Sequence, residues 1–120
     1  LEANMKIITK GGDGFMKLYR SVAYCAELTA IDKLIWCIIS DKCDALEHFQ
    51  GKRWITLSIT ELAKEIGVSR GAALRAVQRL KELGLIERQQ SQIKGYADSY
   101  TVPDQDIVDA IISGIERYGA

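Results

Sequence analysis

The chain has 120 residues, of which 48% are hydrophobic and 27% are charged, and its formal net charge at pH 7 is zero. A chain of this size buries one modest core, so we expect one domain. No uncharged apolar run approaches the ~18 residues that cross a bilayer, and the N-terminal region lacks the apolar stretch of a signal peptide. We therefore expect a soluble, cytoplasmic protein that binds no membrane.

Two N-terminal segments come before the clearer helices. Residues 1–14 are punctuated by glycines, which predicts a flexible segment. From Phe15 to Ala26 the apolar residues recur at helical spacing, which predicts a short helix.

A long apolar helix is expected next. Thr29 is placed to cap it, and apolar residues fall three and four apart at Ile31, Leu34, Ile35, Ile38 and Ile39. Trp36 widens the apolar stripe, so this helix is expected to lie in the core. The segment at 53–57 is rich in aromatic and β-branched residues, which predicts a short strand, and we expect the ring of Trp54 to be buried.

The three cysteines are Cys25, Cys37 and Cys43. Their number is odd and they show no pairing pattern, so we expect buried, reduced thiols. The alternative is a zinc site formed by Cys37, Cys43 and His48. However, C-x5-C-x4-H is not a usual ligand spacing and no second pair of ligands completes it. We expect no metal and no other cofactor.

Catalysis has little support in the sequence. His48 is the single histidine, and no nucleophile elbow, phosphate-binding loop or paired-carboxylate motif is present. We therefore expect no catalytic residue and no enzyme activity.

The start of the next helix is marked by local signals. Ser58 and Glu61 have the spacing of a capping box, and Leu57 and Leu62 have that of a hydrophobic staple. The helix is expected to end at Gly67, because glycine adopts the positive φ with which a chain leaves a helix and turns.

A second helix and a hairpin are predicted to follow this turn. Ser69 is placed to cap the helix, and Gly84 is placed to end it. Strands are expected at 85–90 and 98–102, paired across a loop. The predicted fold class is mainly α with a small β-hairpin wing (α+β), a winged helix-turn-helix over residues 15–102.

The stretch "ITELAKEIGVSRGAALRAVQ" resembles the helix-turn-helix motif of bacterial DNA-binding proteins over all its positions. Ala63 stands where that family places a small residue, and Gly67 stands at its turn. The buried positions of the motif are occupied by Ile66, Val68, Ala73, Ala76 and Val77. "LKELGLIER" resembles the run into the wing of winged-helix proteins, so the resemblance implies double-stranded DNA as the partner.

A narrower resemblance covers most of the chain. "GFMKLYRSV" and "YTVPDQDIV" are similar in layout to segments of plasmid and phage replication-initiator winged helices. This resemblance implies replication initiation or replication control, with a replication-machinery protein as a further partner. A winged-helix transcriptional regulator is the nearest alternative, and a protein-interaction module without DNA readout is another.

The charge distribution agrees with DNA binding, because residues 52–102 carry nine Lys and Arg against five Asp and Glu. In the family, the N-terminal and outward positions of the second helix read the major groove. Here these are Ser69, Arg70, Gly71, Ala72, Leu74, Arg75, Gln78 and Arg79. Leu74 either contacts a thymine methyl or packs against the wing, and the alternative for the arginines is a solvated helix face.

Residues outside that helix are candidates for phosphate contacts. They are Arg53 on the first strand and Arg88, Lys94 and Tyr96 on the wing. Each of them is equally expected as ordinary surface.

Residues 103–120 are expected to form an amphipathic helix after Pro103. Its apolar stripe consists of Ile107, Val108, Ile111, Ile112 and Ile115. The stripe either packs on its own domain or pairs with a second copy. We favour a homodimer, because proteins that read inverted repeats need two copies.

Overall fold

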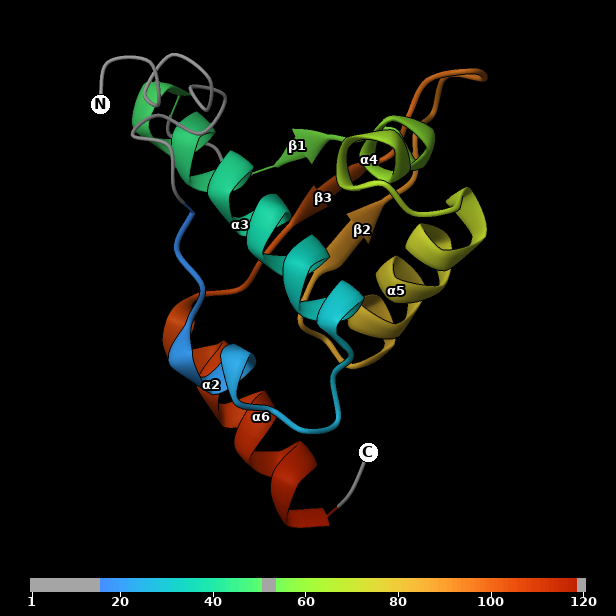
Figure 1. The fold of residues 1–120 in the computed structure, drawn as a ribbon. Helices are drawn as coiled ribbons and strands as arrows, with labels where there is room; N and C mark the ends of the chain where they lie inside the picture. The colour runs from blue at the N-terminus through green and yellow to red at the C-terminus, as the bar shows by residue number, and fades with distance from the viewer. Residues whose placement is uncertain (1–15, 51–53, 119–120) are drawn as a thin grey trace, which may run out of the picture.

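The computed structural model describes residues 16–50 and 54–118. In chain order the elements are α2 (Arg20–Ala23), α3 (Ala30–Gln50), β1 (Ile55–Thr56), α4 (Ile59–Ile66), α5 (Arg70–Glu82), β2 (Glu87–Gln89), β3 (Ser99–Thr101) and α6 (Gln105–Tyr118). Helix α3 runs through the middle, with α4, α5 and the sheet to one side and α2 and α6 to the other (Figure 1). None of the helices in the described ranges is long and apolar enough to cross a membrane.

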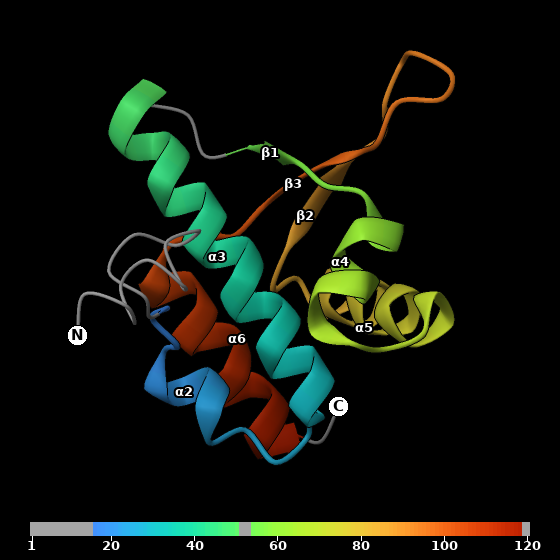
Figure 2. The same cartoon turned by 45° about the horizontal axis from the view of Figure 1, so that its top comes forward.

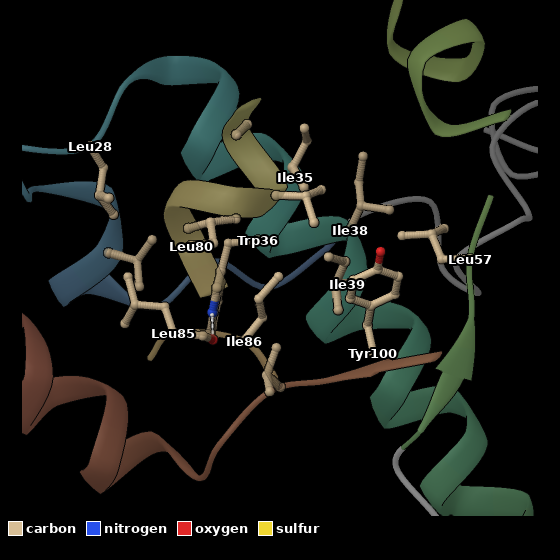
Figure 3. Close-up of a cluster of buried hydrophobic side chains, with 14 of the residues drawn as sticks. Leu28, Ile35, Trp36, Ile38, Ile39, Leu57, Leu80, Leu85, Ile86 and Tyr100 are labelled. Atoms are coloured by element: carbon tan, nitrogen blue, oxygen red, sulfur yellow. Dashed lines mark hydrogen bonds between the residues drawn. The ribbon is translucent and has the colours of Figure 1, made fainter. Parts of the chain in front are cut away.

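Helix α3 is the centre of the hydrophobic core. Ile35, Trp36 and Ile39 are fully buried, and the helix packs against α5, β1 and β3. Leu80 of α5 and the residues that precede β2, Leu85 and Ile86, lie around Trp36, as Figure 3 shows. The prediction that this helix lies in the core is confirmed.

The predicted helix boundaries are confirmed where a cap was expected. Ser58 Oγ accepts a hydrogen bond of 3.2 Å from the Glu61 N–H, and Ser69 Oγ accepts one of 3.1 Å from the Ala72 N–H. Gly67 ends α4 with φ of 73°, in the left-handed region that side chains with a Cβ rarely adopt. The helix-turn-helix is therefore made by local interactions that the sequence encodes.

The sheet has three antiparallel strands in the order β1-β3-β2. Arg88 pairs with Tyr100 across the wing, which confirms the predicted hairpin. Ile55 pairs with Tyr100 on its other side, so β3 is central and β1 closes the sheet. Each strand is shorter than predicted. The predicted fold class, mainly helical with a small sheet, is confirmed.

The segment before α3 differs from its prediction. A helix was expected over 15–26, but within the described residues a single turn, α2, is helical there. The ring of Tyr19 packs edge-on against Trp36 with centroids 4.9 Å apart. The carbonyl oxygen of Lys17 accepts from the Cys37 thiol at 3.1 Å. These contacts with α3 hold residues 17–19 outside a helix, overriding the helical spacing of the apolar residues.

The two tryptophans are placed differently. Trp36 is fully buried, as predicted, whereas the prediction that Trp54 lies in the core is wrong, because 40% of it is exposed. Trp54 stands next to Ile55, whose side chain is buried, and neighbouring residues in a strand point to opposite faces.

Cys25, Cys37 and Cys43 are buried and free, which confirms their prediction as small core residues. Burial raises the pKa of the Cys37 thiol, and the Asp41 carboxylate raises it further.

Helix α6 packs on α2, and both helices lie beside α3 in Figures 1 and 2. Val108, Ile112 and Ile115 are buried in the chain's own core, Ile111 is half-buried, and Ile107 is 48% exposed. Three of the five residues that we assigned to a dimer contact are therefore covered by their own chain. This corrects that assignment for those three residues, because the fold buries their apolar surface without a partner. A homodimer formed elsewhere stays a prediction.

Candidate nucleic-acid interface

Helix α5 has two opposite faces. Ala73, Ala76, Val77 and Leu80 are buried against the core, whereas Gly71, Arg75 and Gln78 are exposed. The exposed residues follow one another at spacings of four and three, so they share one side of the helix. This side carries a guanidinium and an amide, both of which form paired hydrogen bonds with base edges.

The N-terminal end of α5 is fixed to α4. The Val68 N–H donates to the Ala63 carbonyl at 3.0 Å, closing the turn that Gly67 opens. Arg70 Nε donates to Thr60 Oγ1 at 3.2 Å, so an arginine expected to face DNA also ties the two helices together. Ser69 and Arg70 are both exposed at this end.

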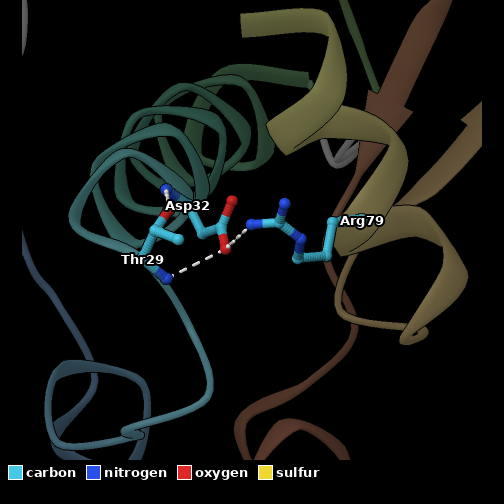
Figure 4. Close-up of polar contacts among 3 residues, drawn as sticks. All are labelled: Thr29, Asp32 and Arg79. Atoms are coloured by element: carbon cyan, nitrogen blue, oxygen red, sulfur yellow. Dashed lines mark hydrogen bonds and ion pairs between the residues drawn. The ribbon is translucent and has the colours of Figure 1, made fainter. Parts of the chain in front are cut away.

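Arg79 is held by an ion pair that the sequence pattern did not predict. Its Nη1 lies 2.8 Å from Oδ2 of Asp32, a fully buried residue near the start of α3 (Figure 4). The same oxygen accepts from the Thr29 N–H at 3.0 Å, while the Asp32 N–H donates to Thr29 Oγ1 at 3.1 Å. Arg79 therefore joins α5 to α3, and no local signal links residues so far apart in the chain.

The flanks of the exposed face are less open. Ala72 and Leu74 are half-buried on either side of it. Ala72, Arg75 and Arg79 face α3 across a small hollow, which is also lined by Thr29, Ile31, Asp32 and Ala76. Arg75 therefore belongs both to the exposed face and to the edge of this hollow.

The wing brings its predicted residues into two groups. Arg88 Nε donates to Asp98 Oδ2 at 2.7 Å, and the Ser91 N–H donates to Asp98 Oδ1 at 2.9 Å. The hydrogen bond to Asp98 raises the pKa of Arg88, so this guanidinium is engaged within the hairpin. Lys94 and Tyr96 are exposed in the loop between β2 and β3 (Figure 2).

Two predicted positions lie outside what the structure describes. They are Arg53 and the side chain of His48. Within the described ranges, no three His, Cys, Asp or Glu side chains gather as the ligands of a metal would.

Known proteins resemble this chain in part. Residues 44–92, less than half of the chain, match the sequence model described as MarR family. No curated protein sequence matches the chain. A solved structure described as a "Possible transcriptional regulator", from Methanosarcina mazei Go1, has a TM-score of 0.54 and 21% sequence identity, with 86% of each chain covered. At that identity the likeness concerns the fold alone.

The matched residues run from the second half of α3 through α4, α5 and β2 to the start of the wing loop. They therefore include the whole helix-turn-helix and the first strand of the hairpin. The chain has a winged helix fold, and the part of it that contains the helix-turn-helix and the first wing strand is similar to the MarR family.

Proposed function

We propose that the chain is a transcriptional regulator that binds double-stranded DNA sequence-specifically through α5. The observation that carries the proposal is the exposed face of Gly71, Arg75 and Gln78 on a helix whose opposite side is buried. The MarR family match and the description of the structural neighbour as a possible regulator both support transcriptional regulation. No finding supports replication initiation, so we do not retain that interpretation.

The proposed contacts follow from side-chain chemistry. Arg75 presents a fork of donors that suits guanine, and Gln78 presents a donor and an acceptor that suit adenine. Arg70, at the capped end of α5, and Lys94 and Tyr96, in the wing loop, are placed to contact phosphates on either side. Arg79 and Arg88 support these elements from within the protein, through Asp32 and Asp98.

The proposal includes a homodimer and no catalysis. Two copies present two recognition helices, which bind the halves of an inverted repeat with greater avidity than one copy does. Most of the α6 stripe is buried in its own chain, so the contact must use other surface, of which Ile107 is an exposed apolar part.

Selection of bound sequences from a random duplex pool tests the proposal. The selected duplex and a scrambled duplex are then compared by fluorescence anisotropy over a range of salt concentrations. We expect the selected duplex to bind at least about 10³-fold more tightly, and both affinities to fall steeply with salt. Equal affinity for both duplexes, or binding insensitive to salt, would reject sequence-specific binding and favour a protein-interaction module.

Two variants separate base reading from phosphate contact. Arg75→Ala should lose about 1–3 kcal/mol of discrimination between the selected and the scrambled duplex, because a bidentate contact with a base is removed. Lys94→Ala, the matched control on the wing, should weaken both duplexes alike. Equal losses on both duplexes for Arg75→Ala would contradict its assignment as a base-reading residue.

A further inference from the structure

The two carboxylate oxygens of Asp32 are in different situations. Oδ2 accepts from Arg79 and from the Thr29 backbone. Oδ1 is buried and has no hydrogen-bond partner among the described residues. Figure 4 shows the two bonds on one oxygen and none on the other. A buried carboxylate oxygen without a donor is costly, so this oxygen calls for a partner.

Asp32 lines the hollow between the start of α3 and α5. Two arginines line the same hollow, Arg75 and Arg79. Arg79 already binds Oδ2, and Arg75 precedes it by one helical turn, so both residues border the hollow between α5 and α3. Arg75 is therefore a donor placed to serve the unpaired oxygen.

In the structure, the guanidinium of Arg75 lies near Gly71 and makes no hydrogen bond to Asp32 Oδ1. A Cβ built on Gly71 would lie 3.3 Å from Arg75 Nη1, so the guanidinium lies over the exposed glycine near the N-terminal end of α5. Arg75 is exposed there, and the glycine leaves room for it. This position directs its donors toward the face that is proposed to read DNA.

We propose that Asp32 Oδ1 is a resting partner of Arg75, so that the guanidinium exchanges between Asp32 in the free protein and a base in the DNA complex. The inference rests on the proposed function and adds Asp32 to it as a positioning residue, which contacts no DNA. Because Arg75 must leave Asp32 to read DNA, the carboxylate competes with the DNA site and lowers its affinity.

A double-mutant cycle between Asp32 and Arg75 tests this competition on the selected duplex. Asp32→Asn is measured in the wild type and again in Arg75→Ala, because any harm to the support of Arg79 is common to both backgrounds. Asp32→Asn should raise DNA affinity relative to its effect in the Arg75→Ala background. The ratio of the two changes in affinity should be roughly two- to fivefold, as for a partly exposed ion pair. A ratio of one would overturn the proposal.

Glu82→Gln is the matched charge control, since Glu82 is an exposed acid at the end of the same helix. The same cycle with Glu82→Gln should give a ratio near one. A ratio equal to that of Asp32→Asn would show that net charge alone causes the effect, and would also overturn the proposal.

The wild-type protein without DNA provides a second test, which stands even if Asp32→Asn fails to fold. The guanidinium protons of Arg75 are followed by nitrogen-15 NMR and assigned by their loss in Arg75→Lys. They should exchange with water several-fold more slowly than those of Arg20, which is exposed on α2. Equal exchange rates would overturn the pairing. A protein that binds no duplex at all would reject the proposed function, while this measurement would still decide the pairing.

Discussion

Trp36 Nε1 donates a hydrogen bond of 2.9 Å to the backbone carbonyl oxygen of Leu85, and both residues are fully buried. The bond joins the first half of α3 to the chain just after Gly84, where α5 has ended and the path into the wing begins. The orientation of α5 is thus tied to α3 by Trp36, just past the C-terminal end of α5, and by Arg79 within α5.

Trp36→Phe should therefore lower the free energy of unfolding by about 1–3 kcal/mol, because it leaves a buried carbonyl without its donor. Urea denaturation followed by circular dichroism measures the change. Trp54→Phe is the matched control, since Trp54 is 40% exposed, and it should change the free energy by no more than about 0.5 kcal/mol. Similar losses for both variants would contradict a specific role for the Trp36–Leu85 bond.

An added Cβ should have opposite effects on stability at two of the glycines. At Gly67 the Cβ would meet nothing within 4 Å, so the cost of Gly67→Val comes from its φ of 73° and should be about 1–2 kcal/mol or more. At Gly114, inside α6, the space is also open and no positive φ is required. Gly114→Ala should therefore stabilise the protein by about 0.5–1 kcal/mol. The midpoints of thermal denaturation of the two variants should shift in opposite directions. An unchanged midpoint for Gly67→Val would contradict a turn at this position that requires positive φ.

The wing should open in acid. The Ser91 N–H and, next, the Arg88 guanidinium hold the pKa of Asp98 below its ordinary value of 3.8. A lowered folded-state pKa means that the carboxylate stabilises the hairpin fully above that ordinary value. The contribution is lost as the pH falls through the lower folded-state pKa. The protection of the Ser91 amide, which is its exchange rate compared with that of an unstructured peptide at the same pH, should fall in that acid range, and Asp98→Asn should already show weak protection at neutral pH. Wild-type protection of the Ser91 amide in Asp98→Asn would contradict a stabilising role for the Asp98 carboxylate in the hairpin.

Helix α6 offers a test that separates folding from assembly. Ile112→Asp should unfold the domain, because it places a charge at a fully buried position. Ile107→Asp should leave the fold intact, since Ile107 is 48% exposed. Sedimentation of Ile107→Asp as a folded monomer, beside a dimeric wild type, would place the homodimer contact at this exposed position. A dimeric Ile107→Asp protein would place it elsewhere.

The parts of the fold that could be predicted from the sequence depend on residues that are close together in the chain. The caps at Ser58 and Ser69 and the left-handed glycine at Gly67 act over a few positions, so a motif of local signals fixes the helix-turn-helix. The hairpin followed from the same kind of signal.

The missed features depend on residues far apart in the chain. The Asp32–Arg79 pair joins two helices across the core, and an arginine on a helix carries no local mark of such a partner. The helical spacing of residues 15–26 was real, yet contacts between that segment and α3 keep most of it out of a helix. The periodicity of α6 predicted a buried face without telling which surface covers it, and the fold supplies its own.

The central place of β3 has a consequence for the way in which the domain comes apart. Its neighbours in the sheet, β1 and β2, stand immediately before α4 and immediately after α5 in the chain (Figure 1). Both chain ends of the helix-turn-helix are therefore hydrogen-bonded to the same strand. Closing the β1–β3 pair requires a long loop that contains both helices, whereas β2–β3 closes across the wing alone. The helix-turn-helix and the sheet thus form one cooperative unit, in which neither α4 nor α5 can be released as a whole while β1 and β2 both remain paired to β3.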